Sequence, residues 1–508
     1  MRRILTVVLV FIPILFLLVY GRTPRNKEPI GTLDLVEDFI VMGWSLDPQV
    51  PSQSIDVQFY VDGPYPQGRF AGKITTNVLR EDVNSSLGVA GLHGFTWFIP
   101  WEFRDGQRHT LYAYGIDASV STMKGLLNGS PKEFQVVPPP SISLNGQPYT
   151  IGAWYFTGWS PANEFHTANA ERVYGRRDWW GGVRDHVLGA DPWGLNVDYS
   201  NREPLLGFYN LLDQQVIDTH IRQAASGGLS FFAFYWYWNT DKNQEAGVSR
   251  PLRMFTSSSL KDYLRFLIAP IKLGNTPMTL SMWRNSVVPF MVERYISDSS
   301  YLKTEDGRSI VILFDLGFAD PADAAKAIEF LRGYIVKKTG KNPVLLVLYH
   351  EKMSSGDLIW AKLNWKIDGF ACFHFPPSQP AEPYTKTLSM WKSVLSKQNV
   401  FFHFPCASTG FDSRPWYRVG WNGTMGVNER PYNTQITISA FADHLRTIKD
   451  YLDTHLRATS KTLIVYAWNE QGETVGIEPN RVDGFRYLKT VQEVFGLSAV
   501  LSRGPSSP

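Results

Sequence analysis

Three glutamates near the carboxyl end of the chain have the residue type and spacing for acid–base chemistry. Glu470, Glu473 and Glu478 follow directly on an apolar run, residues 462–466. Apolar β-forming residues that change abruptly to acids, amides and glycines indicate a buried strand opening into a loop. Carboxylates in such a loop, with aromatic residues nearby, suit proton transfer on a neutral polyhydroxylated substrate such as a sugar. The alternative is an ordinary acidic loop.

The composition limits the classes of fold and partner. The chain has 508 residues, of which 44% are hydrophobic and 19% charged, so two or three domains with a large packed core are expected. A net charge of +3, without a basic run in the body of the chain, gives no reason to expect nucleic acid as a partner. Aromatic residues reach 14%, including 17 Trp. They could fill a core or stack against the faces of sugar rings.

Residues 1–28 have the pattern of a signal peptide or a membrane anchor. Arg2 and Arg3 precede an apolar stretch, residues 4–20, and further basic residues follow it. The stretch is at the short end for a membrane span and slightly long for a signal-peptide core, so both interpretations stay open. In either case we expect the body of the protein to be extracytoplasmic, either secreted or anchored to the membrane through this segment.

The few cysteines and the spacing of the histidines argue against a metal centre. Cys372 and Cys406 are the only cysteines, which excludes a disulfide-dense scaffold and a zinc site of four thiolates. Two buried free thiols are the first interpretation, and one disulfide is the alternative because an export signal allows oxidation. His374 and His403 lack the close spacing of metal ligands. We expect no metal and no cofactor.

The first domain after the anchor, residues 31–137, is predicted to be all-β. Residues 54–62 alternate polar and apolar side chains before the turn Gly63-Pro64. Further short strands are expected at residues 95–100, 109–117 and 135–137. This pattern favours an immunoglobulin-like sandwich. Such a domain could bind carbohydrate, act as a spacer, or serve as a structural cap.

Beyond a proline-rich linker, residues 138–147, strands and helices alternate up to residue 498, before a disordered tail at residues 499–508. Helices are expected at residues 214–226, 260–269, 320–339 and 439–454. Eight apolar runs have the length of buried strands: residues 151–156, 229–237, 278–282, 309–314, 344–348, 367–373, 400–404 and 462–466. The alternation over residues 148–498 predicts an α/β fold, a (β/α)8 TIM-type barrel. An open doubly wound sheet is the alternative, although no Gly-rich phosphate motif follows the first strand.

Active sites of (β/α)8 barrels lie at the carboxyl ends of the strands, so the residues after each run are candidates. In the second run only alternate side chains can reach this rim, either Tyr235 and Tyr237 or Trp236 and Trp238. Other candidates have structural alternatives. The two histidines named above could be core residues, and Asp412 with Arg414 could form an ion pair that holds a loop.

Four segments, spread over about residues 149–494, resemble the glycoside hydrolase family 99-like clan, which includes the WbsX-like domains of polysaccharide gene clusters. The most specific is Trp468-Asn-Glu-Gln-Gly-Glu473 with Glu478-Pro479, similar to W-N-E-W-x-E-G-x-x-I/L-E-P. Residues 151–159 look like the opening strand of the family, and residues 204–210 with Asp213 look like P-x-x-G-x-Y-D. Residues 228–238 match G-I-x-x-F-x-x-x-x-Y-W.

The resemblance implies an endo-acting, retaining glycosidase for α-mannose-type linkages. It implies that Glu470 removes the proton from the 2-hydroxyl of the sugar, which then attacks the anomeric carbon to give a 1,2-anhydro intermediate. Glu473 would protonate the leaving oxygen and later activate water. Two close carboxyls in a desolvated cleft repel each other's charge, so one stays protonated near neutral pH. The candidate substrate-binding residues are Trp154, Tyr155, Tyr209, Tyr235, Trp236, Trp238, Trp283, Asn285, His374, His403, Asp412, Arg414, Trp468, Asn469 and Glu478.

The motif departs from the family pattern at three positions. Gln471 replaces the aromatic residue that usually follows the first Glu, while Gly472 and Thr474 replace a bulkier residue and the usual Gly. These positions would touch the sugar or shape the loop, so the carry-over of substrate specificity is weakened. Two other functions stay open. One is a non-catalytic glycan-binding or polysaccharide-assembly protein with the same cleft, and the other is a transferase that uses the same carboxylate pair.

Overall fold

The computed structural model describes residues 27–144, 146–350, 352–416, 426 and 429–500. The predicted amino-terminal segment lies almost wholly outside these residues, and so does the tail from residue 501. Across the described residues, no helix combines the length and the hydrophobicity that crossing a bilayer requires. The chain divides into two compact units, Met1–Pro138 and Pro139–Pro508. This boundary falls inside the linker predicted at residues 138–147.

The first unit consists of two antiparallel sheets and one short helix. One sheet has the order β1 (Ile30–Glu37), β2 (Ile40–Leu46), β5 (Gly94–Phe98). The other has the order β4 (Arg69–Thr75), β3 (Asp56–Val61), β6 (Arg108–Ile116), β7 (Lys124–Leu126), and β8 (Lys132–Gln135) also pairs with β6. Phe59 of β3 stacks on Trp97 of β5 at 4.0 Å, so the two sheets pack face to face. The strands predicted at residues 54–62, 95–100 and 109–117 are present, the one predicted at 135–137 lies earlier, as β8, and helix α1 (Glu81–Leu87) is an addition.

The second unit is a parallel α/β region. One group of strands runs β12 (Arg265–Leu273), β10 (Phe231–Asn239), β9 (Thr150–Tyr155), β20 (Thr462–Tyr466), β18 (Cys406–Ser408). A second group runs β13 (Ile310–Leu313), β14 (Val344–Tyr349), β15 (Gly369–Cys372), β17 (Phe402–Phe404). All these pairings are parallel. A parallel bridge from Ile271 to Asp315 joins the groups on one side, and β17 and β18 are separated only by Pro405 on the other.

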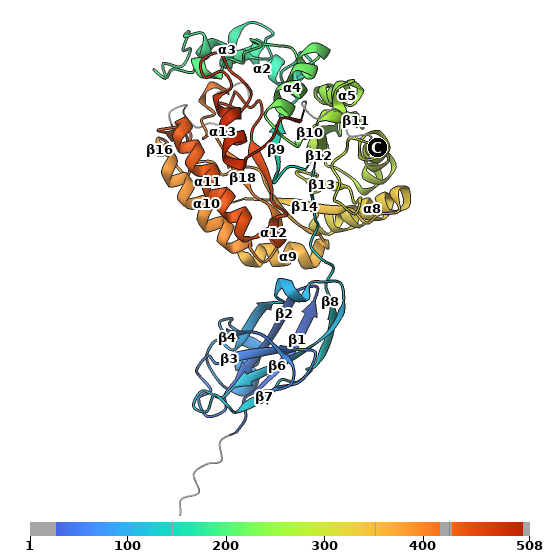
Figure 1. Ribbon diagram of the computed structural model, residues 1–508, viewed down its shortest axis with the longest axis vertical. Helices are drawn as coiled ribbons and strands as arrows, with labels where there is room; N and C mark the ends of the chain where they lie inside the picture. Colours follow the sequence, from blue (N-terminus) through green and yellow to red (C-terminus); the bar gives the residue numbers. More distant parts are fainter. Residues whose placement is uncertain (1–26, 145, 351, 417–425, 427–428, 501–508) are drawn as a thin grey trace, which may run out of the picture. The chain divides into compact units, whose positions relative to one another are not determined.

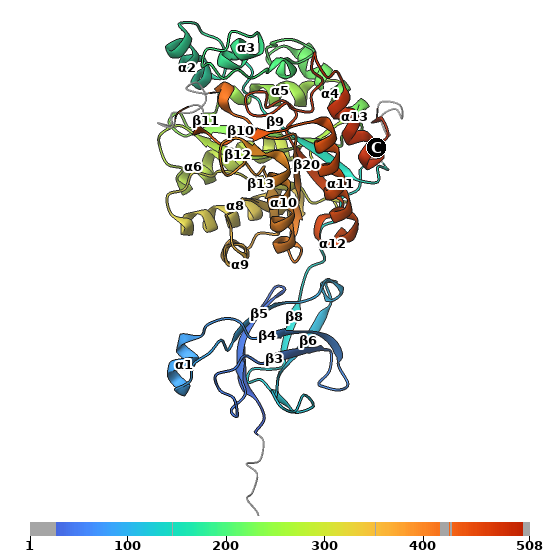
Figure 2. The same cartoon turned by 90° about the vertical axis from the view of Figure 1, so that its left-hand side faces the viewer.

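Helices cover the outside of the parallel strands, as Figure 1 shows for α8 (Pro321–Thr339), α10 (Tyr384–Gln398) and α11 (Ile438–Thr454). Side-chain caps fix several starts: Asp213 caps α4 (Gln214–Ser226), Asp320 caps α8, and Ser354 forms a capping box on α9 (Ser355–Trp365). In both views, α2 (Glu164–Tyr174) and α3 (Gly181–Val187) lie at the end of this unit opposite to α9 (Figure 2). The remaining helices are α5 (Arg250–Ser257), α6 (Leu280–Met282), α7 (Val288–Met291), α12 (Leu456–Thr459) and α13 (Arg486–Phe495).

One pair of predicted elements is wrong. Residues 260–269 were expected to be helical, but the third strand, β12, lies there, and the predicted strand at residues 278–282 leads into α6 instead. The run Phe266-Leu-Ile-Ala-Pro270 is apolar throughout, and it is buried as a strand because it pairs in parallel with β10. Trp283 and Asn285 consequently lie on a π-helical turn, Trp283–Val287, and not at the end of a strand.

The two cysteines are paired. A disulfide joins Cys372 at the end of β15 to Cys406 at the start of β18, with their Cα atoms 5.2 Å apart. The interpretation as two free thiols is therefore wrong, and the alternative of one disulfide holds. The bond ties together two segments that follow neighbouring strands, β15 and β17.

Candidate active site

A pocket of about 270 Å³ lies where the parallel strands end. We call it the carboxylate pocket, because Glu470 and Glu473 both line it. Strand ends supply much of the wall, and loops after β9 and β18 supply the rest. The other lining residues are Phe156, His166, Tyr235, Tyr237, Ile271, Phe314, Phe373, Ser413, Trp416, Arg430 and Tyr466.

The backbone after β20 brings the two carboxylates to the same hollow. The Glu473 N–H donates a 2.9 Å hydrogen bond to the Glu470 carbonyl, which closes a single turn. On the near side the Trp468 N–H donates to the Trp154 carbonyl of β9 at 2.8 Å. On the far side the Glu478 N–H donates to the Trp468 carbonyl at 3.0 Å. The turn is thus tied to β9 on one side and closed onto Trp468 on the other, so both side chains project from a fixed backbone.

The environments of the two carboxyls differ in a way that separates acid from base. Burial raises the pKa of Glu470 well above its usual value, and the charge of Glu473 raises it further. Burial also raises the pKa of Glu473, but a hydrogen bond from Tyr466 and the positive charges of Arg430 and Arg202 oppose that rise. In the free protein the last proton of the pair therefore stays on Glu470. Two residues of the same type thus supply both an acid and a base.

Alternation along β10 decides which aromatic side chains reach the pocket. Tyr235 and Tyr237 line it, so the first of the two alternatives holds. Trp236 and Trp238 point to the opposite face and pack on Phe290 of α7, at 6.2 and 5.7 Å between ring centroids. As candidates for sugar contact these two tryptophans are corrected, because a helix covers them.

Trp154 lies beneath the carboxylate pocket and not in its wall. It is fully buried, it stacks on Tyr235 at 5.5 Å, and its indole N–H donates to the Cys372 carbonyl at 3.3 Å. Phe314 and Phe373, which follow β13 and β15, pack edge to face at 4.9 Å and line the pocket above it. Trp154 therefore supports the aromatic wall and is not among the residues that line the pocket.

The opposite wall is Trp416, which comes from the segment after β18. It stacks on Trp159 at 5.1 Å, and Trp159 stacks on Trp180 at 3.8 Å. A Cβ atom on Gly472 would lie 1.2 Å from Trp416 Nε1, so Trp416 occupies the space that a larger residue at position 472 would need. The departure from the family pattern at Gly472 is thereby explained. His166 packs against the same indole at 4.2 Å, and burial lowers its pKa to about 3, so it is neutral.

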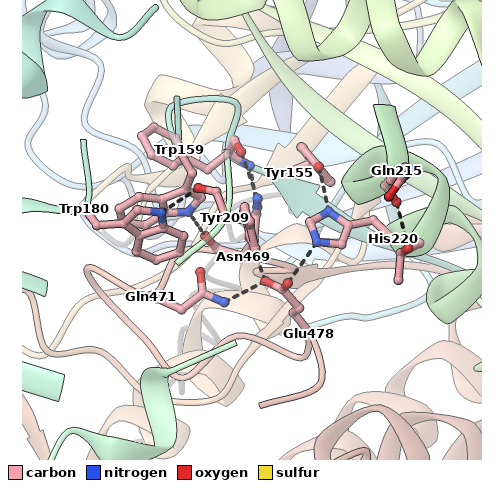
Figure 3. A network of polar contacts seen from close by, with 11 residues as sticks. Tyr155, Trp159, Trp180, Tyr209, Gln215, His220, Asn469, Gln471 and Glu478 are labelled. Carbon is pink, nitrogen blue, oxygen red and sulfur yellow. Dashed lines mark hydrogen bonds and ion pairs between the residues drawn. The ribbon is translucent and has the colours of Figure 1, made fainter. Parts of the chain in front are cut away.

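A buried polar network supports the loop from behind (Figure 3). Glu478 accepts hydrogen bonds from Tyr209 at 2.8 Å and from Gln471 at 2.9 Å, and its other oxygen pairs with His220 Nε2 at 2.9 Å. The second ring nitrogen of His220 lies 2.8 Å from the Tyr155 hydroxyl. None of these residues lines the carboxylate pocket. The predicted substrate contacts Tyr155, Tyr209 and Glu478 therefore lie in this network and not in the pocket wall: His220 contacts both Tyr155 and Glu478, and Tyr209 donates to Glu478.

Asn469 joins the loop to the end of β9. Its side chain accepts from the Phe156 N–H at 2.8 Å and donates to the Phe156 carbonyl at 2.9 Å. Its carbonyl accepts from the Trp159 indole at 2.6 Å, and Trp468 beside it is fully buried against Phe232. Asn469 and Trp468 are therefore enclosed in the structure that supports the loop, and neither lines the carboxylate pocket.

Asp412 and Arg414 form the expected structural ion pair. Their charged atoms lie 2.7 Å apart, and Arg414 stacks on the Tyr432 ring at 3.4 Å. The Asp412 N–H donates to the Glu473 carbonyl at 2.6 Å, and Tyr199 donates to the Asp412 carboxylate at 2.8 Å. The pair thus holds the backbone of Glu473 from outside the pocket.

The remaining candidates lie away from the carboxylate pocket. Trp283 is buried and donates to the Ala327 carbonyl of α8 at 2.9 Å, while Asn285 is exposed on the same π-helical turn. His403 is a core histidine that contacts the Phe401 carbonyl at 3.0 Å, and burial lowers its pKa to about 4. His374 stands behind the wall and stacks on Tyr466 at 4.4 Å. Its burial lowers its pKa to about 3.

Several pocket residues were not candidates in the sequence. Phe314, Phe373 and Tyr466 follow or end predicted strands, and the rule that barrel sites lie at strand ends could have found them. His166, Trp416 and Arg430 come from long connections, where no periodic pattern indicates direction. Among the described residues, no three His, Cys, Asp or Glu side chains converge as ligands for a metal ion.

Part of the chain matches a known protein family. Residues 285–491 match the family model described as glycosyltransferase WbsX, so this part is a WbsX family domain. The search of curated proteins returned no match. The match spans β13 to β20 and both glutamates.

Solved structures show similarity over most of the chain. A GH99 endo-alpha-mannosidase from Bacteroides thetaiotaomicron, in complex with BIS-TRIS-propane, is 17% identical with a TM-score of 0.46, and the alignment covers 70% of this chain and 98% of that one. A glycoside hydrolase-like protein is 14% identical with a TM-score of 0.46, covering 70% and 96%. A b-glucuronidase from Ruminococcus gnavus, in complex with D-glucuronic acid, is 8% identical with a TM-score of 0.35, covering 92% and 67%.

Proposed function

We propose that this protein, with its WbsX family domain at residues 285–491, is a retaining glycoside hydrolase that cleaves α-linked glycans, mannose-type linkages first among them. One observation supports the proposal: Glu470 and Glu473 share an aromatic-walled pocket in which burial raises the pKa of both, while the charge of Glu473 adds to the rise at Glu470 and Tyr466, Arg430 and Arg202 oppose it at Glu473. A carboxylic acid and a carboxylate on either side of a sugar are the groups that glycosidic bond cleavage needs.

The scaffold we propose for this site is a (β/α)8 barrel, preceded by an immunoglobulin-like sandwich. The two groups of parallel strands are joined by the Ile271–Asp315 bridge and by the continuity of β17 with β18. A closed ring of eight parallel positions is the simplest arrangement that these pairings support. In such a ring the carboxyl ends of all strands meet, which is where the carboxylate pocket lies.

Cleavage proceeds through the 2-hydroxyl of the sugar. Glu470 removes its proton, O2 bonds to the anomeric carbon, the glycosidic C–O bond breaks, and the leaving oxygen takes a proton from Glu473. Water then attacks the anomeric carbon of the 1,2-anhydro sugar while Glu473 takes its proton. The bond from the anomeric carbon to O2 breaks, and Glu470 returns the proton to O2. Two inversions give net retention.

This assignment requires one proton to move within the pair when substrate binds. In the free protein the proton stays on Glu470, whereas the reaction needs it on Glu473. A sugar hydroxyl that donates to Glu470 stabilises the charged form of that carboxyl and lowers its pKa. Because the two carboxyls share one proton, Glu473 is then protonated and ready to act as the acid.

A transferase is the second candidate, because the matching family model carries that description. The same pair would deliver the sugar to an acceptor hydroxyl instead of to water. A non-catalytic glycan-binding or polysaccharide-assembly role is the third. The pocket has the same residues in all three cases. The products of a reaction, or their absence, therefore distinguish a hydrolase, a transferase and a binding protein.

The decisive experiment uses purified protein from residue 28 onward, incubated with α-mannans and N-glycans. A hydrolase releases new reducing ends with retained anomeric configuration, which proton NMR follows directly. A transferase yields longer products when an acceptor is added. Binding without any product, in the wild type as in Glu470→Gln and Glu473→Gln, would overturn the enzymatic proposal.

We also propose that the catalytic unit acts outside the cytoplasm, held at or released from the membrane through residues 1–28. Arg2, Arg3 and the apolar stretch after them support this proposal. Fractionation of cells that express the full chain, followed by amino-terminal sequencing of the mature protein, tests it. Full-length protein in the soluble cytoplasmic fraction would contradict it.

A further inference from the structure

A second cavity of about 450 Å³ opens beside the carboxylate pocket. We call it the outer pocket. The residues that give it chemical character are Glu164, Phe165, Asn239, Lys242, Gln244 and Arg250. It lies within the same unit, between the segment that follows β9 and the segment that follows β10.

The outer pocket continues the carboxylate pocket along the same strands. On β10, Tyr237 lines the carboxylate pocket and Asn239 lines the outer one. On β12, Ile271 lines the carboxylate pocket and Leu273 lines the outer one. Residues two apart on a strand point to the same side and are about 7 Å from each other. The two cavities are therefore successive positions along one face.

The start of α2 forms a wall that the two cavities share. His166 faces the carboxylate pocket, and Phe165 beside it faces the outer pocket. Phe165 is 46% exposed, which is high for a phenylalanine and leaves a ring face free for stacking. An aromatic face with amides close by, here Asn239 and Gln244, is a combination that binds pyranose rings.

Two cations set this cavity apart from the first. Lys242 and Arg250 are exposed, and no carboxylate of the described residues pairs with either. The acidic side chains around them are engaged elsewhere. Glu164 pairs with Arg177 at 2.8 Å, Glu245 pairs with Arg253, and Asp241 accepts from the backbone N–H groups of Asn275 and Thr276 at 3.0 and 2.8 Å.

The position of Arg250 strengthens the case for an anion. Arg250 is the first residue of α5, where the positive end of the helix dipole disfavours a cation. A negatively charged group in the outer pocket would lie near this helix end as well as near both cationic side chains. Charge complementarity thus favours an acidic ligand over a neutral one.

We propose that the outer pocket is a glycan subsite for an acidic sugar residue, one that carries a carboxylate, sulfate or phosphate, next to the residue that is cleaved. This inference rests on the proposed function and narrows it: the substrate is an acidic polysaccharide of at least two sugars. Arg or Lys hydrogen bonds to such a group contribute roughly 10- to 100-fold in affinity.

The test measures binding without turnover. Glu470→Gln protein is titrated by calorimetry with phosphorylated mannan oligosaccharides and with the same oligosaccharides after phosphate removal. Uronate-containing oligosaccharides and their carboxyl-reduced forms give a second matched pair. We expect at least one acidic member to bind ~10-fold or more tightly than its neutral partner, with an affinity that falls as salt rises.

The combined substitution Lys242→Ala and Arg250→Ala should abolish this preference and leave the affinity for the neutral partner unchanged. Lys242→Arg with Arg250→Lys is the matched control, because it keeps both charges. Unchanged melting temperatures show that the variants fold. Equal binding of acidic and neutral partners in the unsubstituted pocket overturns the inference.

The two proposals fail differently. Suppose that the double alanine variant cleaves neutral glycans with the same KM as the wild type, and that the wild type prefers no acidic substrate. The subsite proposal is then wrong and the hydrolase proposal stands. If acidic oligosaccharides bind through Lys242 and Arg250 but no glycan is ever cleaved or extended, the subsite stands and the catalytic proposal is wrong.

Discussion

Gln471 Nε2 donates a 2.9 Å hydrogen bond to the Glu478 carboxylate, although neither residue lines the carboxylate pocket. Gln471 stands between the two proposed catalytic residues in the chain, so this contact turns the intervening side chain away from the pocket. The family pattern has an aromatic residue at this position. In this chain the side chain at this position shapes the loop and does not line the pocket.

We predict that Gln471→Ala lowers kcat more than it raises KM. The substitution removes a hydrogen bond to a buried carboxylate, worth about 1–3 kcal/mol, and loosens the turn from Glu470 to Glu473. Gln471→Glu should be more harmful at neutral pH, because it places a second negative charge against Glu478. Steady-state kinetics with glycan binding to an inactive background provide the readout. An unchanged kcat in both variants would show that the network has no part in positioning.

The acid and the base can be told apart by the leaving group. Glu473→Gln should reduce cleavage of natural glycans by roughly 10²- to 10⁴-fold, yet still release the aryl group rapidly in the first turnover of an aryl glycoside whose leaving group needs no proton, with slow hydrolysis afterwards because water is no longer deprotonated. Glu470→Gln should lose activity on both, because the 2-hydroxyl must still be deprotonated. A 2-deoxy substrate should resist cleavage by the wild type. If the two variants exchange this behaviour, the roles of the carboxyls are reversed.

The raised pKa values also predict that replacing Glu470 stabilises the folded protein, whereas most substitutions destabilise it. A carboxyl whose pKa rises on folding contributes its full stability below its usual pKa of 4.5, and that stability is lost as pH rises through the folded value. Each unit of rise corresponds to ~1.4 kcal/mol. Glu470→Gln removes a carboxyl whose ionisation favours the unfolded chain, so it should melt about 2 °C or more above the wild type at pH 8.

The same comparison at pH 4 provides the control. There Glu470 is protonated in both the folded and the unfolded chain, and the melting temperatures of variant and wild type should agree closely. Substitution of an exposed acid, Glu133→Gln, should show no such dependence on pH. A lower melting temperature of Glu470→Gln at pH 8 would contradict the burial of this carboxyl.

Trp416 and Gly472 should behave as one unit. Gly472→Ala places a Cβ against the Trp416 indole, so the indole must move and the pocket wall is disturbed. We expect a rise in KM and a loss of stability of about 1–3 kcal/mol from this overpacking. In a Trp416→Ala background the same alanine meets no indole and should have little further effect. Additive effects in the double variant would refute the contact.

Much of this architecture follows from sequence pattern. Residues 462–466 and 214–226 were expected as strand and helix, and β20 and α4 have these bounds. Both have clear signals: the strand is wholly apolar, and Asp213 caps the start of the helix. The motif around Glu470 and Glu473 likewise places both acids at a strand end, where the structure has them.

Other features could not be read from the sequence. The apolar run of β12 fits a buried helix or a buried strand equally well, and only its neighbours in the sheet decide between them. Trp283 and Asn285 were misplaced for that reason. His166 and Trp416 come from long connections, whose direction depends on packing and not on any period. Glu478 was assigned to the substrate because a sequence does not show that three partners already occupy its carboxylate.

The contributions to the carboxylate pocket come from separable parts of the chain. The two acids belong to one short segment after β20, whereas Trp416 and His166 are carried by connections outside the sheet. A change in either connection can reshape which glycan is recognised without rebuilding the reacting groups. Such a division allows evolution to vary selectivity while the chemistry is inherited intact, and it offers the same freedom to protein engineering.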